Sequence, residues 1–331
     1  MRCAVIGAGA WGTALADLLV RSGHDARLWA FEADVVAAVN GEHRNPVFLA
    51  GFDLAPALVA TRDHAKALEG ARLVIYATPS QHLREIARAG ASSVARDAVL
   101  AVASKGIEQQ TLALMSEVIE AEVAGREVVA VSGPSFAAEV AGRQPTAVVA
   151  ASSSAAAARL TQDTMSSGMF RVYTHDDIIG VELGGSLKNV MAVASGIVEG
   201  VGLGHNSRAA LITRGLAEMT RLGVALGARG STFAGLAGIG DLVLTCTGAL
   251  SRNRAVGIEV GRGKTLEQAL AGKPTVAEGV ATTRSALALA QREGVEMPIV
   301  QMVHRILFEG HPAKQAVPDL MTRGLRAEQD A

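Results

Sequence analysis

The sequence predicts an α/β domain built on a largely parallel sheet, followed by an all-helical domain. In the first half, short β-rich runs alternate with helical patterns, whereas after about Asp176 long Ala, Leu and Ile patterns replace the strands. Regular strand–helix alternation is typical of a parallel sheet covered by helices on both faces. A chain of 331 residues is also long for a single core. We therefore expect one domain over residues 1–176 and a helical domain over residues 177–331.

Eight short apolar runs are expected to form the sheet, with helical patterns between and after them. The predicted strands are Arg2–Ile6, Ala26–Ala30, Ala57–Thr61, Leu73–Ala77, Ala98–Ala103, Val128–Val131, Ala147–Ala150 and Phe170–Tyr173. Predicted helices of the first domain include Gly12–Ser22, Gln81–Ala89, Thr111–Glu122 and Ser154–Met165. Those of the second are Asp177–Glu199, Ala209–Leu226, Arg254–Gly261, Leu266–Leu270, Thr282–Glu293 and Ile299–Phe308.

The composition argues against several functional classes. A formal net charge of −1 offers no electrostatic footprint for nucleic acid or an anionic membrane. No apolar run reaches about 18 residues without a polar break, so no membrane span is expected. Cys3 and Cys246 are the only cysteines, which favours a reducing cytoplasm over a disulfide framework. The N-terminus enters a predicted strand directly, so no signal peptide is expected. The eight histidines lack ligand spacing, so no metal site is expected.

A glycine motif at the N-terminus carries the main functional signal. The apolar run Cys3–Ile6 meets Gly7-x-Gly9-x-x-Gly12, and a helical pattern follows at once. A strand, a tight glycine turn and a helix N-terminus together present backbone N–H groups and a positive dipole end to a pyrophosphate. This context predicts dinucleotide binding in a Rossmann-like domain.

The end of the second predicted strand bears on the type of dinucleotide. In such folds an acidic residue about 20 positions after the glycine turn accepts hydrogen bonds from the ribose, whereas a nearby Arg accommodates a 2′-phosphate. Here the strand leaves through Ala30, Phe31 and Glu32, and the nearest Arg in the sequence is Arg27, inside the strand. Glu32 therefore favours NAD over NADP, with a solvent-directed Glu32 as the alternative.

Small, polar or cationic residues follow the other strands of the predicted sheet. Ligands of open parallel sheets bind beyond the carboxyl ends of the strands. Lys105 follows one strand, within Ser104-Lys105-Gly106, and Gly133 and Ser135 follow the next. Ordinary turn chemistry explains part of this pattern, but a lone cation at the rim indicates a ligand contact. Ser135 is expected to cap the next helix.

A lysine in the helical half is the candidate acid–base group. On a helix, Lys188 shares a face with Gly184 and Gly185. Glycine costs about 1 kcal/mol inside a helix, so two adjacent glycines indicate a close approach. We expect them to leave a bare, apolar patch around Lys188, where the ammonium can act as a general acid or base. The alternative is a surface lysine over a close helix crossing.

Two further loops of the helical half carry polar groups suited to a phosphorylated substrate. Asp241 lies between glycines and an apolar run, where it could orient Lys188, bind a hydroxyl or cap a helix. Arg252 offers a planar fork for phosphate at a helix start, flanked by Ser251 and Asn253. A solvated basic turn is the alternative for Arg252. A third loop, Thr275–Gly279, predicts a helix cap at Thr275.

Together these motifs resemble the bacterial type of NAD(P)-dependent glycerol-3-phosphate dehydrogenase over essentially the whole chain. The matching pieces are GAGAWGTALA at 7–16, SKGI at 104–107, SGPSFAAEVA at 132–141, LGGSLKNVMAVASGI at 183–197, ALITRGLAEM at 210–219, GLAGIGDLVLTCTG at 235–248, SRNR at 251–254, VAEGV at 276–280 and PIVQMVHRILFEG at 298–310. The resemblance implies reversible hydride transfer between NAD(P)H and dihydroxyacetone phosphate, giving sn-glycerol 3-phosphate for phospholipid synthesis.

The resemblance also implies roles for individual residues. Lys188 matches the proton acceptor. The residues that match substrate contacts are Lys105, Gly133, Ser135, Lys188, Asp241, Ser251, Arg252 and Asn253. Besides Gly7, Gly9, Gly12 and Glu32, the residues expected at the cofactor are Ala10, Trp11, Phe31, Lys105, Ala137, Arg252, Val276 and Glu278.

Two departures and two alternatives accompany this resemblance. Ala10 stands where a Ser is usual, and Phe31 stands where His or Arg is common, which removes a cation from the 2′ position. A related hydroxyacid dehydrogenase and a non-catalytic NAD-sensing protein are the alternative functions. The Ala- and Gly-rich helical half is compatible with a homodimer.

Overall fold

The computed structural model describes residues 1–272, 277–325 and 327–328 and divides into two compact units. The first unit comprises Met1–Lys105 and Ala113–Ile178, and the second comprises Gly106–Leu112 and Ile179–Ala331. The short segment Gly106–Leu112 thus leaves the first unit and packs with the helical one. Among the described residues, no helix is long and apolar enough to cross a membrane.

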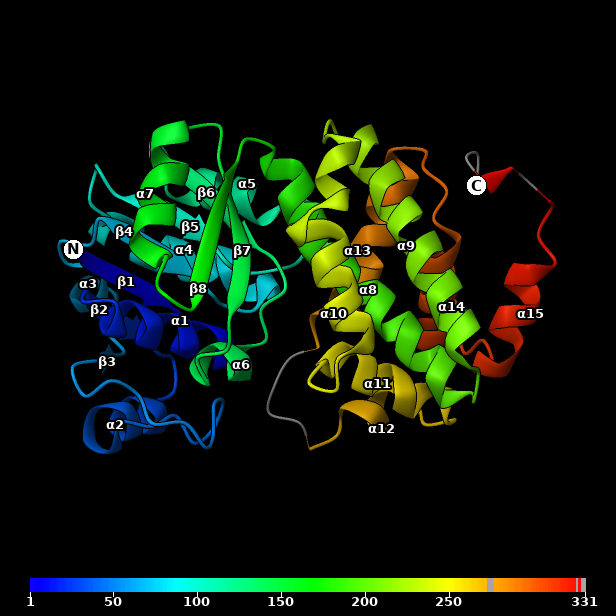
Figure 1. The fold of residues 1–331 in the computed structure, drawn as a ribbon, viewed down its shortest axis with the longest axis horizontal. Coiled ribbons are helices and arrows are strands. Elements are labelled where there is room, and N and C mark those ends of the chain that lie inside the picture. The colour runs from blue at the N-terminus through cyan, green and yellow to red at the C-terminus, as the bar shows by residue number, and fades with distance from the viewer. Residues whose placement is uncertain (273–276, 326, 329–331) are drawn as a thin grey trace. The chain divides into compact units, whose positions relative to one another are not determined.

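The first unit is built on one eight-stranded sheet of order β3-β2-β1-β4-β5-β6-β7-β8 (Figure 1). Every neighbouring pair is parallel except β6 and β7, which are antiparallel. The order reverses between β1 and β4, the switch point at which ligands bind in such sheets. The strands are β1 (Arg2–Ile6), β2 (Asp25–Trp29), β3 (Val59–Thr61), β4 (Leu73–Tyr76), β5 (Val99–Val102), β6 (Glu127–Ser132), β7 (Thr146–Ala151) and β8 (Phe170–His175).

Helices cover both faces of the sheet because its strands are apolar on both sides. Cys3 and Val5 of β1 belong to the core under one helical layer, whereas Ala4 and Ile6 belong to the core under the other. The first layer contains α1 (Ala10–Arg21), α2 (Ala33–Glu42), α6 (Ala137–Ala141) and α7 (Ala155–Met165). The second contains α3 (His64–Leu68), α4 (Leu83–Gly90) and α5 (Met115–Glu122), with short 3-10 turns at Ser80–His82 and Ala91–Ser93.

The second unit is helical and has α8 (Ile178–Gly200) as its core. All residues from Gly180 to Val198 are buried, including the polar ones, as expected of a helix surrounded by other helices. The remaining helices are α9 (His205–Ala225), α10 (Asp241–Thr247), α11 (Arg252–Gly261), α12 (Leu266–Leu270), α13 (Glu278–Arg292), α14 (Pro298–Phe308) and α15 (Ala316–Met321), with short turns at Gly230–Ala234, Leu236–Gly240 and Ala313–Gln315.

Several predicted element boundaries differ from the structure, among them α9, which begins at His205 and not at Ala209. The helix expected from Thr111 begins only at Met115, because Leu112 adopts a left-handed conformation with φ of 61° at the end of the segment that packs with the helical unit. The strand expected from Ala57 is shorter and begins at Val59. Conversely, α13 begins at Glu278, four positions before the expected Thr282. The cap expected at Thr275 lies outside the described residues.

Candidate active site

The glycine motif forms a tight turn between β1 and α1. Gly7 has a φ of +115°, and a Cβ there would lie 2.7 Å from the carbonyl oxygen of Ala77. A Cβ at Gly12 would lie 1.8 Å from the carbonyl oxygen of Gly7, so only glycine lets α1 pack this closely on the turn. At Gly9 a Cβ would meet nothing within 4 Å. Gly9 therefore leaves open space in front of the helix N-terminus.

Asn45, for which the sequence predicted no role, holds this turn through hydrogen bonds of its side chain. Its buried side chain donates to the carbonyl oxygen of Ala8 at 2.9 Å and to Thr13 Oγ1 at 2.8 Å. Its Oδ1 accepts from the backbone N–H of Phe48 at 3.1 Å. The lone Asn follows α2 and belongs to no periodic pattern, so the sequence carried no local signal for this role.

The turn has the properties that a dinucleotide pyrophosphate requires. Gly9 occupies the N-cap of α1 without a side-chain hydrogen bond, and the first turn contains no acidic residue. The first N–H groups of the helix are thus available to an anion. Three buried polar atoms near these strand ends also have no hydrogen-bond partner in the described part of the chain: Trp11 Nε1, Thr78 Oγ1 and Ser132 Oγ. The open space at Gly9 and these orphaned donors fit a bound dinucleotide.

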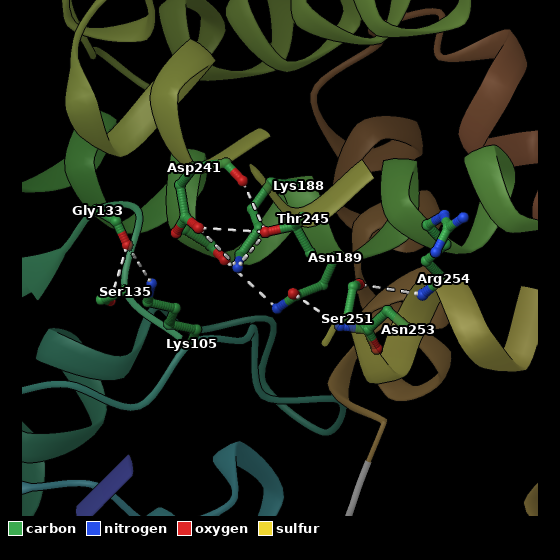
Figure 2. A network of polar contacts seen from close by, with 11 residues as sticks. Lys105, Gly133, Ser135, Lys188, Asn189, Asp241, Thr245, Ser251, Asn253 and Arg254 are labelled. Carbon is green, nitrogen blue, oxygen red and sulfur yellow. Dashed lines mark hydrogen bonds and ion pairs between the residues drawn. The ribbon is translucent and has the colours of Figure 1, made fainter. Parts of the chain in front are cut away.

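Lys105 and Ser135 converge on one backbone carbonyl of the first unit. Lys105 Nζ donates to the carbonyl oxygen of Gly133 at 3.1 Å, and Ser135 Oγ donates to the same oxygen at 2.9 Å (Figure 2). The expectation that Ser135 caps the next helix is wrong, because Phe136 holds the N-cap of α6 and Ser135 turns back to Gly133. Ala137 is the first residue of α6.

Within the helical unit, Lys188 forms a buried polar triad. Its Nζ donates to Asp241 Oδ1 at 3.0 Å and to Thr245 Oγ1 at 2.9 Å (Figure 2). Thr245 in turn donates to the backbone carbonyl of Asp241 at 2.6 Å. Asp241 opens α10 as its first residue, with Gly240 at the N-cap, so Thr245 lies one turn further on the same face. That i, i+4 spacing was the signal by which Thr245 could have been found.

The surroundings of Lys188 differ from the bare patch expected around Gly184. A Cβ at Gly184 would lie 2.4 Å from the carbonyl oxygen of Ala237, so the backbone of the turn Leu236–Gly240 fills that place. Gly184 allows the turn to approach α8, and this turn leads directly into Asp241. The close helix crossing that was the alternative interpretation is therefore part of how Lys188 obtains its partner.

A second polar cluster joins three helices of the same unit. Asn253 Nδ2 donates to Asn189 Oδ1 at 2.8 Å, and the backbone N–H of Gly279 donates to Asn253 Oδ1 at 2.9 Å. Asn189, next to Lys188 on α8, was not assigned a role from the sequence. The amide of Asn253 still has a second N–H, so it can also serve a ligand.

The start of α11 carries the remaining predicted phosphate ligands. Ser251 caps α11, its Oγ accepting from the backbone N–H of Arg254 at 3.2 Å, which leaves its hydroxyl proton to donate. Arg252 is the first helical residue and is exposed overall. Partial desolvation of its guanidinium lowers the pKa of Arg252, and the negative charge of Glu278 only partly opposes this shift. Glu278 opens α13, and Val276 lies outside the described residues.

These groups define the chemistry that each unit can support. The first unit offers a dinucleotide turn with a lysine at the strand ends. The helical unit offers a buried ammonium held by a carboxylate, and beside it a cluster of neutral donors with an arginine. Acid–base transfer at a carbinol and recognition of an anion follow from these groups, which are typical of nicotinamide-dependent dehydrogenases. Among the described residues no group of His, Cys, Asp and Glu is arranged to hold a metal.

Comparisons with known proteins identify the family. A family model described as the NAD-dependent glycerol-3-phosphate dehydrogenase N-terminus matches residues 2–158, and the model of the C-terminus of that enzyme matches residues 177–318. The chain belongs to the NAD-dependent glycerol-3-phosphate dehydrogenase family.

Individual relatives are similar to this chain over nearly its full length. The chain is 54% identical to glycerol-3-phosphate dehydrogenase [NAD(P)+] of Geobacter sulfurreducens over 331 residues, covering 99% of this chain and 98% of that protein. It is 53% identical to the protein of the same name from Geobacter sp. strain M21 over 330 residues, with the same coverage. The crystal structure of the Coxiella burnetii glycerol-3-phosphate dehydrogenase superposes with a TM-score of 0.94 at 41% identity, covering 97% of this chain and 99% of that one.

Proposed function

We propose that this enzyme transfers hydride reversibly between NAD(P)H and C2 of dihydroxyacetone phosphate to give sn-glycerol 3-phosphate. When bound, the nicotinamide supplies or accepts the hydride. In reduction a proton must reach the carbonyl oxygen as the carbinol forms, and in oxidation it must leave. The observation that carries the proposal is the buried Lys188 ammonium held at 3.0 Å by Asp241 in a chain that belongs to this family.

Lys188 is proposed as the group that moves this proton. Its ammonium carries three hydrogens, of which one points to Asp241 and one to Thr245. In reduction the ammonium gives a proton to the developing alkoxide, and in oxidation the amine takes it back. Asp241 orients the side chain and balances its charge. Such general acid–base catalysis contributes roughly 10²–10⁴ in rate.

The dinucleotide is proposed to bind on the first unit at the glycine turn. Gly7, Gly9 and Gly12 shape the turn, with Ala10 and Trp11 at the start of α1. At the adenosine end of the dinucleotide, Phe31 and Glu32 are the proposed contacts, and Glu32 favours NAD over NADP. At the nicotinamide end, the proposed contacts are Lys105 and Ala137. From the helical unit, Arg252, Val276 and Glu278 are proposed as additional contacts on the basis of the family resemblance.

The substrate is proposed to be held by its phosphate. Arg252 provides a charged fork, while Ser251 and Asn253 provide neutral donors beside it. Lys105, Gly133 and Ser135 are proposed to contact the oxygens of the triose. Binding energy from the remote phosphate then positions C2 for reaction.

The phosphate assignment can be tested at Arg252. Arg252→Ala should reduce the stabilisation of the transition state for dihydroxyacetone phosphate by about 1.5–3 kcal/mol, the value for a lost charged hydrogen bond. The loss would be measured as a fall in kcat/KM. Arg262→Ala, an exposed arginine just after the same helix, is the matched control and should leave kcat/KM unchanged. Unaltered kinetics in Arg252→Ala would remove this residue from phosphate binding and favour a related hydroxyacid dehydrogenase with a carboxylate substrate.

We also propose a cytoplasmic location and a homodimer. Both cysteines are free and buried, so this fold does not depend on a disulfide, which supports a reducing compartment. The Ala- and Gly-rich helical half supports a dimer. Sedimentation equilibrium of the purified enzyme measures its mass in solution and tests this assembly.

A further inference from the structure

Arg62 lies beside the place where the adenosine ribose is proposed to bind. β3 pairs in parallel with β2 so that Thr61 is opposite Trp29, the last residue of β2. Arg62 therefore leaves the sheet at the same level as Ala30, next to Phe31 and Glu32. Its Nε donates to the carbonyl oxygen of Phe31 at 3.0 Å. Phe31 stands where His or Arg is common, so β2 carries no cation at this position. Arg62, which follows the neighbouring strand β3, supplies one instead.

The backbone of Arg62 is held in place on both sides. Trp29 Nε1 donates to the carbonyl oxygen of Arg62 at 2.9 Å, and the Trp29 ring stacks on His64 with centroids 4.3 Å apart. Asp63 caps α3, its Oδ1 accepting from the backbone N–H of Ala65 at 2.9 Å. A guanidinium carried on a fixed backbone and bound through Nε loses little further freedom when a ligand binds.

The guanidinium retains donors for a ligand. Within the part of the chain that the structure describes, Nε makes the only hydrogen bond of this side chain, and no ion pair joins Arg62 to Glu32. Its two terminal nitrogens carry four N–H groups in the planar fork that suits a phosphate. Arg27, the nearest arginine in the sequence, instead donates to the Lys66 carbonyl and to Glu69.

We propose that Arg62 binds the 2′-phosphate of NADP and so lets this enzyme use NADP as well as NAD. Glu32, at the N-cap of α2 with no hydrogen bond from its side chain to the helix, serves the ribose hydroxyls of NAD. The inference rests on the proposed placement of the adenosine end at β2. It makes the choice of cofactor depend on two residues from different strand ends, one acidic and one basic.

Binding of dinucleotide fragments tests this role without turnover. Calorimetry would compare 2′,5′-ADP, which carries the 2′-phosphate, with 5′-ADP, which lacks it. Arg62→Leu should weaken 2′,5′-ADP about tenfold and leave 5′-ADP within about twofold, since one charged contact is lost at a partly screened site. Arg62→Lys should fall between wild type and Arg62→Leu, because it keeps the charge but lacks the fork. Arg72→Leu is the matched control, because this exposed arginine directly precedes β4 and so lies at the N-terminal ends of the strands, whereas Arg62 lies at their C-terminal ends.

Steady-state kinetics provide the second measurement. The ratio of kcat/KM for NADPH to kcat/KM for NADH should fall about tenfold in Arg62→Leu and stay constant in Arg72→Leu. Equal weakening of both fragments, no change in either, or wild-type enzyme that binds 5′-ADP but not 2′,5′-ADP would each overturn the role of Arg62. None of these results would affect the proposed reaction, which fails only if NADH and NADPH are both left unoxidised with dihydroxyacetone phosphate.

Discussion

Lys188 and Asp241 form an ion pair in the interior of the helical unit, although 53 positions separate them in the chain. The side chains are only 9% and 1% exposed, and Nζ lies 3.0 Å from Oδ1. Two opposite charges withdrawn from water depend on each other, because either one alone would carry the full cost of desolvation. This dependence links the stability of the unit to its proposed chemistry and makes both measurable.

Removing the ammonium should abolish proton transfer. Lys188→Met keeps the length of the side chain but leaves no acidic proton, so kcat should fall by roughly 10²–10⁴. Stopped-flow measurement of NADH oxidation with dihydroxyacetone phosphate records the rate. Lys264→Met, which removes an exposed lysine paired with Glu259, is the control. Turnover of Lys188→Met at the wild-type rate would refute the acid–base role of Lys188.

Removing the carboxylate should cost stability as well as activity. Asp241→Asn preserves the shape of the side chain but leaves the buried ammonium without an opposite charge. Breaking a buried ion pair in this way typically costs about 3–5 kcal/mol. Urea unfolding measures the free energy of unfolding. Asp53→Asn, at an exposed pair with Arg44, should change this free energy by less than about 1 kcal/mol. Equal values for the two variants would mean that Asp241 does not compensate Lys188.

The fold was predictable because its periodic signals are local. All eight strands were expected near their observed positions, since buried parallel strands read as short apolar runs between helical patterns. Departures occur where distant parts of the chain decide the outcome. The antiparallel pairing of β7 with β6 and the packing of Gly106–Leu112 with the helical unit depend on contacts that no local pattern encodes.

Residues of the candidate site could be predicted where a motif carries its own geometry. Lys188, Asp241 and the start of α11 could be named because glycines and helix starts surround them. Asn45, Arg62 and Asn189 could not, because each acts on a residue of another element and has no special spacing of its own. Polar contacts of this kind follow from the folded backbone, so the sequence predicts them only after the topology is known.

The glycines of the dinucleotide turn should separate stability from binding. Gly12→Ala places a Cβ 1.8 Å from a carbonyl oxygen of the backbone, so it should unfold the first unit or lower its melting temperature markedly. Gly9→Ala meets nothing within 4 Å, so the melting temperature should stay close to wild type. Its methyl group instead enters the space proposed for the pyrophosphate, and NADH affinity should fall at least about tenfold. Fluorescence titration with NADH and thermal unfolding measure both effects in the two variants. A Gly9→Ala protein with unchanged NADH affinity would show that the pyrophosphate does not bind at this turn.

Asn45 should stabilise the same turn through its buried hydrogen bonds. Asn45→Leu is similar in volume but leaves the Ala8 carbonyl and the Phe48 N–H without these partners, at a cost of about 1–3 kcal/mol for each buried group left unsatisfied. Urea unfolding and NADH titration measure the loss of stability and of affinity. Asn40→Leu is a control, since Asn40 also bonds backbone groups, those of Ala60, but lies outside the turn. It should lose stability with a smaller effect on NADH affinity, and the reverse order would contradict the role of Asn45.

Glu218 should make the stability of the helical unit depend on pH. This residue of α9 is 3% exposed, and its carboxylate accepts from the backbone N–H groups of Ile299 at 2.7 Å and Val300 at 3.3 Å at the start of α14. Burial raises the pKa of Glu218 from 4.5 to about 7, although these hydrogen bonds and the charges of Arg221 and Arg323 act in the opposite direction. The folded state therefore holds a proton that the unfolded state releases between about pH 4.5 and 7.

It follows that the contribution of Glu218 to stability is full below about pH 4.5 and is lost as the pH rises to about 7, a change of about 3 kcal/mol. Glu218→Gln cannot titrate, so the difference in unfolding free energy between wild type and this variant should shift by that amount in favour of the variant from pH 4.5 to 8. Glu267→Gln, at an exposed position on α12, serves as the control and should show no such shift. A wild-type curve parallel to that of Glu218→Gln would show that the pKa of Glu218 is the same in the folded and unfolded states.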